Sequence, residues 1–267
     1  MMVMISWKLM TTKPLNSVKN CGTSVSCQDC SLASLCLPIS LHGDDVERLD
    51  SIIKRGRPFQ KNQTIWRQGD GFQSVLAIRS GSVKSFVTSP SGEEQIIGFH
   101  FAGELIGLSG FHNKKYPIST VSLETTTVCD IPYDSLDALA DDLPELRDQI
   151  LSSLSQEVSE DQQMMLLLSK KTSEQRLASF LISLSERFQR RGYSATRFRL
   201  TMSRNDLGNF LGLAVETISR IFSKFQQKEI LQFIDSSRDI ELLNVDELYR
   251  MADVPLPNEK GSAKRAC

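Results

Sequence analysis

The sequence predicts an α+β protein made of a cysteine-bearing arm, an antiparallel β domain, a long helix and a C-terminal helical unit. Four of the six cysteines lie within residues 21–36. Short strand-like runs separated by glycine turns fill residues 58–132, and helical periodicity returns after Tyr133. We therefore expect an arm over residues 1–40, a β domain over 41–143, a long helix over 144–171, a helical unit over 172–250 and a disordered tail over 251–267.

Charge is unevenly distributed along the chain. The whole chain has a net charge of −1, yet residues 170–230 contain 12 Lys and Arg against 5 Asp and Glu. A basic segment beside an acidic remainder is the pattern expected of a nucleic-acid-binding protein. A solvated basic helical surface would explain the charge equally well.

The first residues carry no targeting signal of the secretory type. Met1–Trp7 is apolar, but it is too short for a signal-peptide core and no basic region precedes it. The longest apolar runs, such as Met164–Leu168, are far too short to span a membrane. We expect a cytoplasmic protein with no membrane partner, and Met10 is an alternative start of translation.

The β domain follows a short amphipathic helix over residues 44–54. Turn signals such as Gly69-Asp70-Gly71 and Ala102-Gly103 separate the strand-like runs. Several short strands at this spacing predict an antiparallel barrel or sandwich. The expected strands are Gln63–Trp66, Ser74–Arg79, Ser82–Thr88, Gln95–Phe101 and Val121–Ile131.

The long helix is expected to begin near Pro144, because proline is favoured in a first helical turn and no later Gly or Pro interrupts the pattern through Lys171. Such a helix either pairs with a copy of itself or is buried against the β domain, and we favour pairing. Its apolar stripe is interrupted by Asp161, whose charge would oppose its own copy in a symmetric dimer. We therefore predict a dimer switch formed by Asp161 with Ile150, Leu154, Val158 and Met165.

A helix-turn-helix is predicted within residues 203–222. Gly208 is small where two helices would cross, and Gly212 suits a left-handed turn between them. Five apolar residues would join the two helices. They are Leu207, Leu211, Leu213, Ile218 and Ile221.

The second helix of this motif would present polar side chains to DNA. Glu216, Ser219 and Arg220 lie near its N-terminal end, where recognition helices meet base edges. Glu216 and Arg220 could also form an ordinary i,i+4 surface pair, or Glu216 could orient Arg220. Basic residues on either side suit phosphate contacts, and these are Lys224, Lys228, Arg197 and Arg199.

The cysteines indicate a metal site. Cys27, Cys30 and Cys36 form a C-x2-C-x5-C chelate, and Cys129 near the end of a strand is the candidate fourth ligand. From spacing alone, an iron–sulfur cluster and structural zinc fit equally well, and plain redox thiols are a further alternative. Cys21 and Cys267 are spare. No nucleophile–base motif accompanies the three scattered histidines, so we expect no enzyme activity.

These parts together resemble the FNR class of the CRP/FNR superfamily of bacterial transcription regulators, especially the pseudomonad-type anaerobic regulators. The resemblance covers residues 27–243. Its clearest motifs are Cys-Gln-Asp-Cys-Ser-Leu-Ala-Ser-Leu-Cys over 27–36, Ala-Ile-Arg-Ser-Gly-Ser-Val-Lys over 77–84, Gly-Glu-Glu-Gln-Ile-Ile-Gly-Phe-His over 92–100 and Leu-Gly-Leu-Ala-Val-Glu-Thr-Ile-Ser-Arg over 211–220.

The resemblance implies a β-roll sensor domain, a winged helix-turn-helix and a [4Fe–4S] cluster on Cys27, Cys30, Cys36 and Cys129. It implies oxygen sensing, in which the intact cluster promotes a homodimer that binds a TTGAT-type inverted repeat in double-stranded DNA. It also implies contact with RNA polymerase, for which the turn at 90–94 is one candidate.

One departure from the wider superfamily concerns the effector. Cyclic-AMP binders follow Gly-Glu-Leu with an Arg-Ser pair that clamps the phosphate. Here Gly103-Glu104-Leu105 is followed by Tyr116-Pro117-Ile118-Ser119, with no arginine between positions 80 and 146. A phosphate would lack its bidentate partner, so we expect no cyclic nucleotide.

Overall fold

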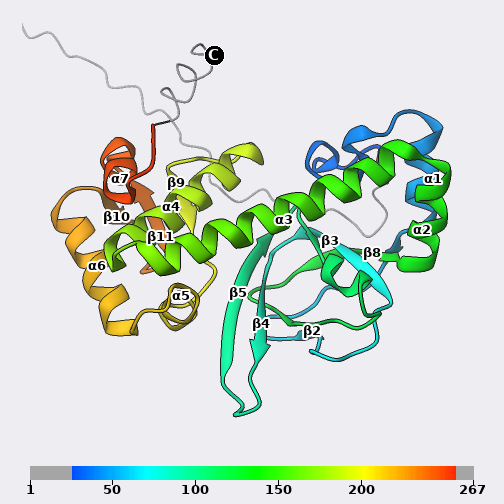
Figure 1. Cartoon of the computed structure of the whole chain (residues 1–267). Helices are drawn as coiled ribbons and strands as arrows, with labels where there is room; N and C mark the ends of the chain where they lie inside the picture. Colours follow the sequence, from blue (N-terminus) through cyan, green and yellow to red (C-terminus); the bar gives the residue numbers. More distant parts are fainter. Residues whose placement is uncertain (1–25, 257–267) are drawn as a thin grey trace, which may run out of the picture.

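The computed structural model describes residues 26–256 as one molecule with a long helix running along its whole length (Figure 1). The spare Cys21 and Cys267, the start at Met10 and most of the predicted tail lie outside these residues. The helices are α1 (Asp44–Ile52), α2 (Tyr133–Asp142), α3 (Pro144–Lys170), α4 (Ser173–Arg190), α5 (Arg204–Leu211), α6 (Val215–Gln227) and α7 (Val245–Ala252), with short 3-10 turns η1 (Ala33–Leu35), η2 (Leu37–Ser40) and η3 (Leu108–Phe111).

The β domain is a roll of two antiparallel four-stranded sheets, as the fold class predicts. One sheet has the order β1-β8-β3-β6 and the other β2-β7-β4-β5. The β4–β5 hairpin is long, with Ser82 opposite Phe101 and Thr88 opposite Glu94. The strands are β1 (Lys54–Arg55), β2 (Thr64–Trp66), β3 (Ser74–Ser80), β4 (Ser82–Thr88), β5 (Glu94–Phe101), β6 (Leu105–Ile106), β7 (Ser119–Ser122) and β8 (Thr127–Pro132).

The prediction of one strand over Val121–Ile131 is wrong. The chain leaves β7 in one sheet, turns at residues 123–126 and enters β8 in the other sheet. The buried Thr126 fixes this crossing, because its hydroxyl donates to the carbonyl of Ser82 at 3.2 Å. The β-branched residues of this segment favour extended backbone throughout, so its composition does not indicate the turn between β7 and β8.

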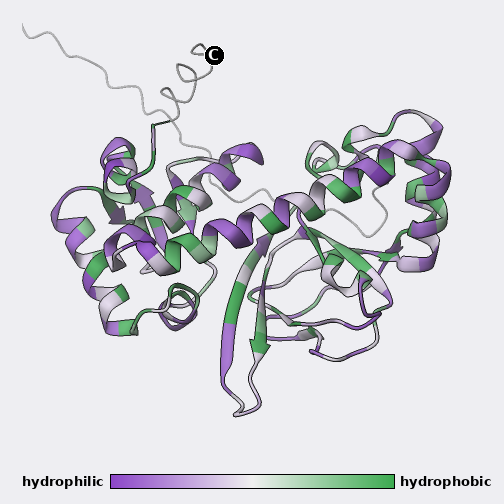
Figure 2. Cartoon of the chain, in the orientation of Figure 1, coloured by the Kyte–Doolittle hydropathy of each residue, from purple (hydrophilic) through white to green (hydrophobic). Residues whose placement is uncertain are grey.

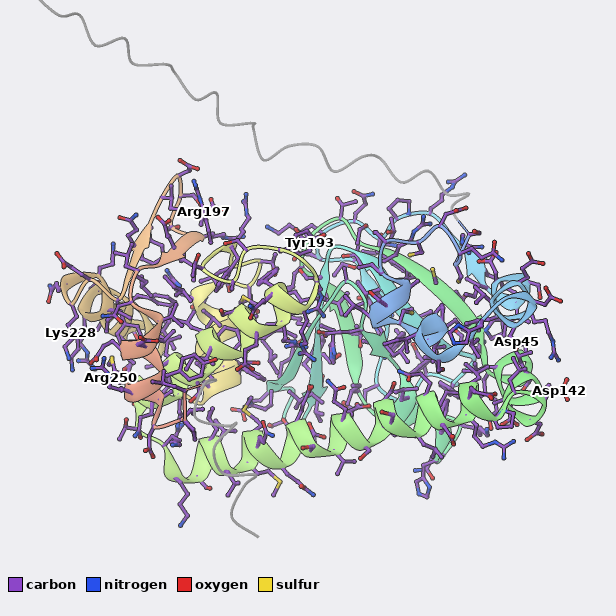
Figure 3. The ribbon with its side chains drawn as sticks, turned by 90° about the horizontal axis from the view of Figure 1, so that it is seen from above. Asp45, Asp142, Tyr193, Arg197, Lys228 and Arg250 are labelled. Carbon is purple, nitrogen blue, oxygen red and sulfur yellow. The ribbon has the colours of Figure 1, made fainter. Side chains whose placement is uncertain are left out.

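The first half of α3 packs against its own protomer. Leu146 and Ile150 are buried in a core shared with the cysteine arm, α1, α2 and β3, and Leu154 packs against that core. The second half exposes apolar side chains, with Val158 55% and Met165 70% exposed. Hydrophobic and hydrophilic residues therefore occur along the whole length of the helix (Figure 2). Seen from above, α3 runs along one edge of the molecule (Figure 3).

The C-terminal unit contains α4–α7 and a three-stranded sheet of order β10-β11-β9. The predicted hairpin is present as β10 (Leu231–Phe233) and β11 (Asp239–Leu242), and a third strand, β9 (Arg197–Arg199), adds to it. Helix α7 ends at Ala252, which is buried, so order extends into the segment predicted as a disordered tail from residue 251. Over residues 26–256, no helix combines the length and hydrophobicity needed to cross a membrane.

Candidate functional site

Four cysteines from separate segments line one cavity. Cys27 and Cys30 lie in turns of the arm, Cys36 joins η1 to η2, and Cys129 lies on β8. Together they border one space whose other walls are mostly apolar. The fold therefore brings the predicted fourth cysteine to the other three. Within the described part of the chain, no three His, Cys, Asp or Glu side chains are grouped closely enough to hold one metal ion as they stand.

Burial in this cavity favours the protonated form of three of the four thiols. Burial raises the pKa of Cys27 and Cys129, and it raises the pKa of Cys36 to about 12. The carboxylate of Asp50 raises the pKa of Cys27 further, and the charges of neighbouring cysteines raise the pKa of both Cys27 and Cys36. A metal bound here would have to displace the protons, since thiolate is the ligating form.

Two charged residues that the sequence analysis did not identify brace the cysteine loop. A carboxylate oxygen of Asp50 accepts the backbone N–H of Cys27 at 2.8 Å and also pairs with Arg55. Arg55 lies directly opposite Cys129 in the β1–β8 pairing. The positive charge of Arg55 lowers the pKa of Cys129, against the effect of burial. This guanidinium therefore offsets negative charge in the cavity.

The donor set fits an anionic iron–sulfur group. Four sulfur ligands around an apolar space are the usual setting of such a cluster. The buried Nε of Arg55 has no hydrogen-bond partner among residues 26–256. A buried donor of this kind is costly to leave unpaired, and a neighbouring anionic sulfur would accept from it.

The helix-turn-helix has the predicted geometry. Ser203 begins α5 with a capping box to Asp206, and Gly212 ends it in the left-handed region with φ of 64°. A Cβ at Gly208 would lie 2.6 Å from the carbonyl oxygen of Leu213, so α5 approaches the turn that leads into α6 too closely for a side chain at this position. Of the five predicted anchors Leu213 is half-buried, and the buried four are Leu207, Leu211, Ile218 and Ile221.

The face of α6 predicted to read DNA is open to solvent. Glu216, Ser219 and Arg220 are all exposed. Arg220 lies 3.5 Å from the hydroxyl of Thr217. In the described structure it forms no ion pair with Glu216, so the predicted bracing pair is absent from the free protein.

The predicted phosphate-binding residues differ in their surroundings. Arg197 and Arg199 are exposed on either side of the buried Phe198 on β9. Lys224 instead pairs with Glu174 of α4 at 2.5 Å. A phosphate contact by Lys224 would have to replace that carboxylate.

The predicted dimer-switch residues divide between two environments. Ile150 and Leu154 contact the core of their own protomer, whereas Val158, Asp161 and Met165 face solvent. Partial burial and the charge of Glu160 raise the pKa of Asp161. The apolar surface of α3 available to a partner helix thus includes Leu151 and lies mostly in the second half of the helix.

Comparison with known proteins gives the family. The chain matches the cyclic nucleotide-binding domain over residues 56–142 and the Crp-like helix-turn-helix domain over residues 175–251. It is 54% identical over 226 residues to the transcriptional activator protein Anr of Pseudomonas protegens, covering 85% of this chain and 92% of that protein. The chain belongs to the CRP/FNR family of transcription regulators.

The chain is also similar over most of its length to another curated regulator and to a solved structure. The fumarate and nitrate reduction regulatory protein of Escherichia coli is 44% identical over 238 residues, or 89% of this chain and 94% of that protein. The structure of FixK2 from Bradyrhizobium japonicum gives a TM-score of 0.69 at 26% identity, covering 77% of this chain and 100% of that chain. This CRP/FNR regulator is a DNA-binding protein and not an enzyme, as the sequence predicted.

Proposed function

We propose that this CRP/FNR regulator senses oxygen through a [4Fe–4S] cluster held by Cys27, Cys30, Cys36 and Cys129, and thereby controls genes of anaerobic metabolism. The observation that carries the proposal is the convergence of these four cysteines on one cavity. A cube with one thiolate on each iron needs ligands spread around such a space, whereas four ligands of one zinc ion must meet at a point. The names of relatives, such as "Anaerobic regulatory protein" of Haemophilus influenzae at 48% identity, support the physiological part.

In this proposal the cluster supplies the reactivity toward oxygen, and the protein supplies the response. The arm, α1 and the first half of α3 share one hydrophobic core, so loss of order at the cysteines would disturb the packing of Leu146 and Ile150. The exposed second half of α3 would pair with its copy in a homodimer. Asp161 would oppose this pairing, and a cysteine loop ordered by the cluster would favour it. Such a balance of a few kcal/mol is enough for a two-state switch.

The DNA-binding step rests on α6. Glu216, Ser219 and Arg220 would read the base edges of a TTGAT-type inverted repeat, with Arg197, Arg199 and Lys224 on phosphates. A homodimer would meet the two half-sites symmetrically. The turn at residues 90–94 is an exposed candidate for contact with RNA polymerase.

We assign no cyclic nucleotide to the β-roll. The carboxylate of Glu104, in the Gly-Glu-Leu stretch, is already paired with Arg187 of α4 and with Arg191 directly after that helix. The chain also lacks the phosphate-clamping arginine noted in its sequence.

Anaerobic purification tests the cofactor. The proposal expects visible absorbance with iron and labile sulfide in equal amounts, and specific DNA binding that disappears in air. A colourless zinc protein, or DNA binding unaffected by air, would favour the alternative of zinc or plain redox thiols.

Single serine substitutions test the ligands. Replacing Cys27, Cys30, Cys36 or Cys129 should abolish cluster retention, because a hydroxyl is a poor substitute for thiolate. Cys21→Ser and Cys267→Ser are the matched controls and should retain it. Loss of the cluster in Cys21→Ser with retention in Cys27→Ser would disprove the assignment.

A further inference from the structure

The β-roll and the DNA-binding unit share one hydrophobic core in a single protomer. Phe86, Ile96, Phe99 and Phe101 of the roll belong to the same buried cluster as the residues that hold α4, α5 and α6 together. The ring of Phe99 lies 5.0 Å from that of Phe210 on α5, in an edge-to-face arrangement. The two units are therefore packed together over β4 and β5.

Polar contacts fix the register of this packing. Asn209 of α5 accepts the backbone N–H of Ile96 at 2.6 Å and donates to the carbonyl of Glu94 at 2.7 Å. Lys84 of β4 pairs with Asp206 at 2.7 Å. Directional bonds of this kind specify one orientation, whereas apolar contact alone would permit sliding.

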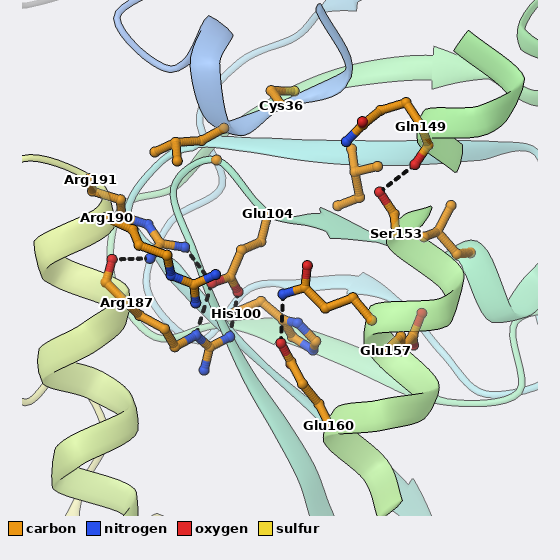
Figure 4. A pocket seen from close by; sticks show the side chains of 15 residues that line it. Cys36, His100, Glu104, Gln149, Ser153, Glu157, Glu160, Arg187, Arg190 and Arg191 are labelled. Atoms are coloured by element: carbon orange, nitrogen blue, oxygen red, sulfur yellow. Dashed lines mark hydrogen bonds and ion pairs between the residues drawn. The ribbon is translucent and has the colours of Figure 1, made fainter. Parts of the chain in front are cut away.

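The strongest polar contact is a clamp around Glu104. The carboxylate of Glu104 receives two hydrogen bonds from Arg187, at 2.9 and 2.6 Å, and a further one from Arg191 (Figure 4). Arg187 also donates to the carbonyl of Phe99 at 2.9 Å, and Arg191 donates to that of Ala102. Arg187 near the end of α4 and Arg191 directly after it thus hold the end of β5 and the turn that follows, which together we call the Phe99–Glu104 turn.

The clamp is sheltered from water. The side chains of Arg187, Arg191 and Glu104 are only 16%, 6% and 21% exposed. Burial by itself would raise the pKa of Glu104, but the two arginines outweigh it and hold that pKa below its ordinary value. Charged groups in such surroundings are stabilised only while they stay paired, so the turn and α4 remain together.

The same turn contacts the cysteine loop. Gly103 has a left-handed backbone with φ of 86°, and a Cβ there would lie 3.1 Å from Cβ of Leu35. Gly103 also lines the cavity of the four cysteines, while Leu35 and Cys36 line the neighbouring cavity that contains Glu104. The residues of the turn therefore touch the cysteine loop on one side and α4 on the other.

We propose that Glu104 is a positioning residue that holds the DNA-binding unit on the β-roll, and that the Phe99–Glu104 turn couples the cysteine loop to this unit within one protomer. The recognition face of α6 stays exposed in the docked arrangement, so docking leaves it free for DNA. This route acts independently of the pairing of α3. Only its link to the cysteine loop rests on the proposed cluster.

The test uses the full chain, purified without oxygen, with Glu104→Gln and Arg187→Gln as the disrupting variants. Arg190→Gln is the matched control, because Arg190 lines the same cavity on the same helix but forms no ion pair with Glu104 in the described structure. The readouts are visible absorbance, sedimentation, X-ray scattering and binding to a duplex with the TTGAT inverted repeat. Glu104→Asp, which keeps the charge, should give intermediate values.

We expect Glu104→Gln and Arg187→Gln to bind the duplex about tenfold more weakly, as is usual when two coupled units lose their connection. Their radius of gyration should rise, while absorbance and dimer content match those of the parent. Equal scattering and equal affinity in Glu104→Gln and Arg190→Gln would overturn the proposal. Loss of absorbance in Glu104→Gln would also overturn it, because Glu104 would then support the cysteine loop itself.

Two further comparisons keep the test decisive. If Glu104→Gln does not fold, the double variant Arg187→Gln with Arg191→Gln removes the clamp from the other side, and its scattering and DNA affinity are compared with the parent instead. X-ray scattering of air-treated protein, which lacks a cluster, separates the clamp proposal from the proposed cluster function. If the parent never binds a cluster, the proposed function fails, whereas the scattering difference between parent and Arg187→Gln still tests the clamp.

Discussion

Replacing Gly208 by alanine should destabilise the DNA-binding unit, although alanine is the better helix former. In an isolated helix, replacing glycine by alanine increases the stability by roughly 0.5–1 kcal/mol. Here the new Cβ would stand 2.6 Å from the carbonyl oxygen of Leu213, a backbone atom in the turn between α5 and α6. The helices must separate by several tenths of an ångström, and overpacking of this kind costs roughly 1–3 kcal/mol.

The expected net effect is a loss of up to about 2.5 kcal/mol in the free energy of unfolding, which is the overpacking cost less the propensity gain. Urea denaturation without DNA measures it. Ser183→Ala on α4 is the control, because Ser183 is exposed and its replacement gains helix propensity without a clash. Operator affinity should also fall, since α6 shifts against the base edges. A Gly208→Ala protein more stable than the parent would refute the close-crossing argument.

Three other predictions concern single side chains. Arg220→Ala should lower the binding free energy by ~1–3 kcal/mol at one base pair of the operator, whereas Lys224→Ala should weaken binding to all duplexes alike. Binding to single-base operator variants distinguishes the two effects. An equal loss of affinity on every variant would show that Arg220 contacts phosphate instead of a base. Asp161→Ala should form dimers and bind DNA in air-treated protein, because the repulsion between the two Asp161 side chains of a helix pair is removed. Sedimentation measures the dimers. A variant that stays monomeric would show that the switch lies elsewhere. Burial lowers the pKa of His100 to about 4, beside Glu104, Arg187 and Glu160. The unfolded chain therefore binds a proton at His100 below about pH 6.5, whereas the folded protein binds it only near pH 4. The free energy of unfolding consequently falls as the pH drops from 6.5 toward 4. The cluster-free parent should therefore lose up to about 2 kcal/mol more than His100→Gln between pH 6.5 and 5 in urea denaturation; equal losses would contradict this.

Local patterns were sufficient for the elements whose signal is local. The 27 residues of α3 followed from an uninterrupted periodicity after Pro144, and the helix-turn-helix followed from Gly208, Gly212 and their apolar neighbours. The strand β9 was not predicted, because three residues with one buried phenylalanine are too short for a periodic signal. Helix α7 was missed although its buried residues Leu248, Tyr249 and Ala252 have helical spacing, a pattern that the sequence analysis did not use.

The contacts that organise the site are long-range, and no local pattern announces them. Glu104 and Arg187 are 83 positions apart, and each alone is indistinguishable from an ordinary surface charge. Asp50 could not be matched with the N–H of Cys27 without knowing that α1 lies beside the arm. The cysteines were an exception, because cysteine is rare enough that Cys129 could be grouped with the three cysteines of the arm by residue type rather than by position, and the four do line one cavity.

The placement of Cys129 on β8 has a consequence for chain entropy. Three of the four cysteines lie on the arm, and the fourth lies far along the chain in the β-roll. A group bound to all four would therefore act as a covalent staple that closes a long loop. Crosslinks that close loops of about a hundred residues restrict the unfolded chain by roughly 4–5 kcal/mol. Oxidative loss of the group would release that constraint at once, so the arm should become the first segment that proteases cut, before any change reaches the helices that bind DNA.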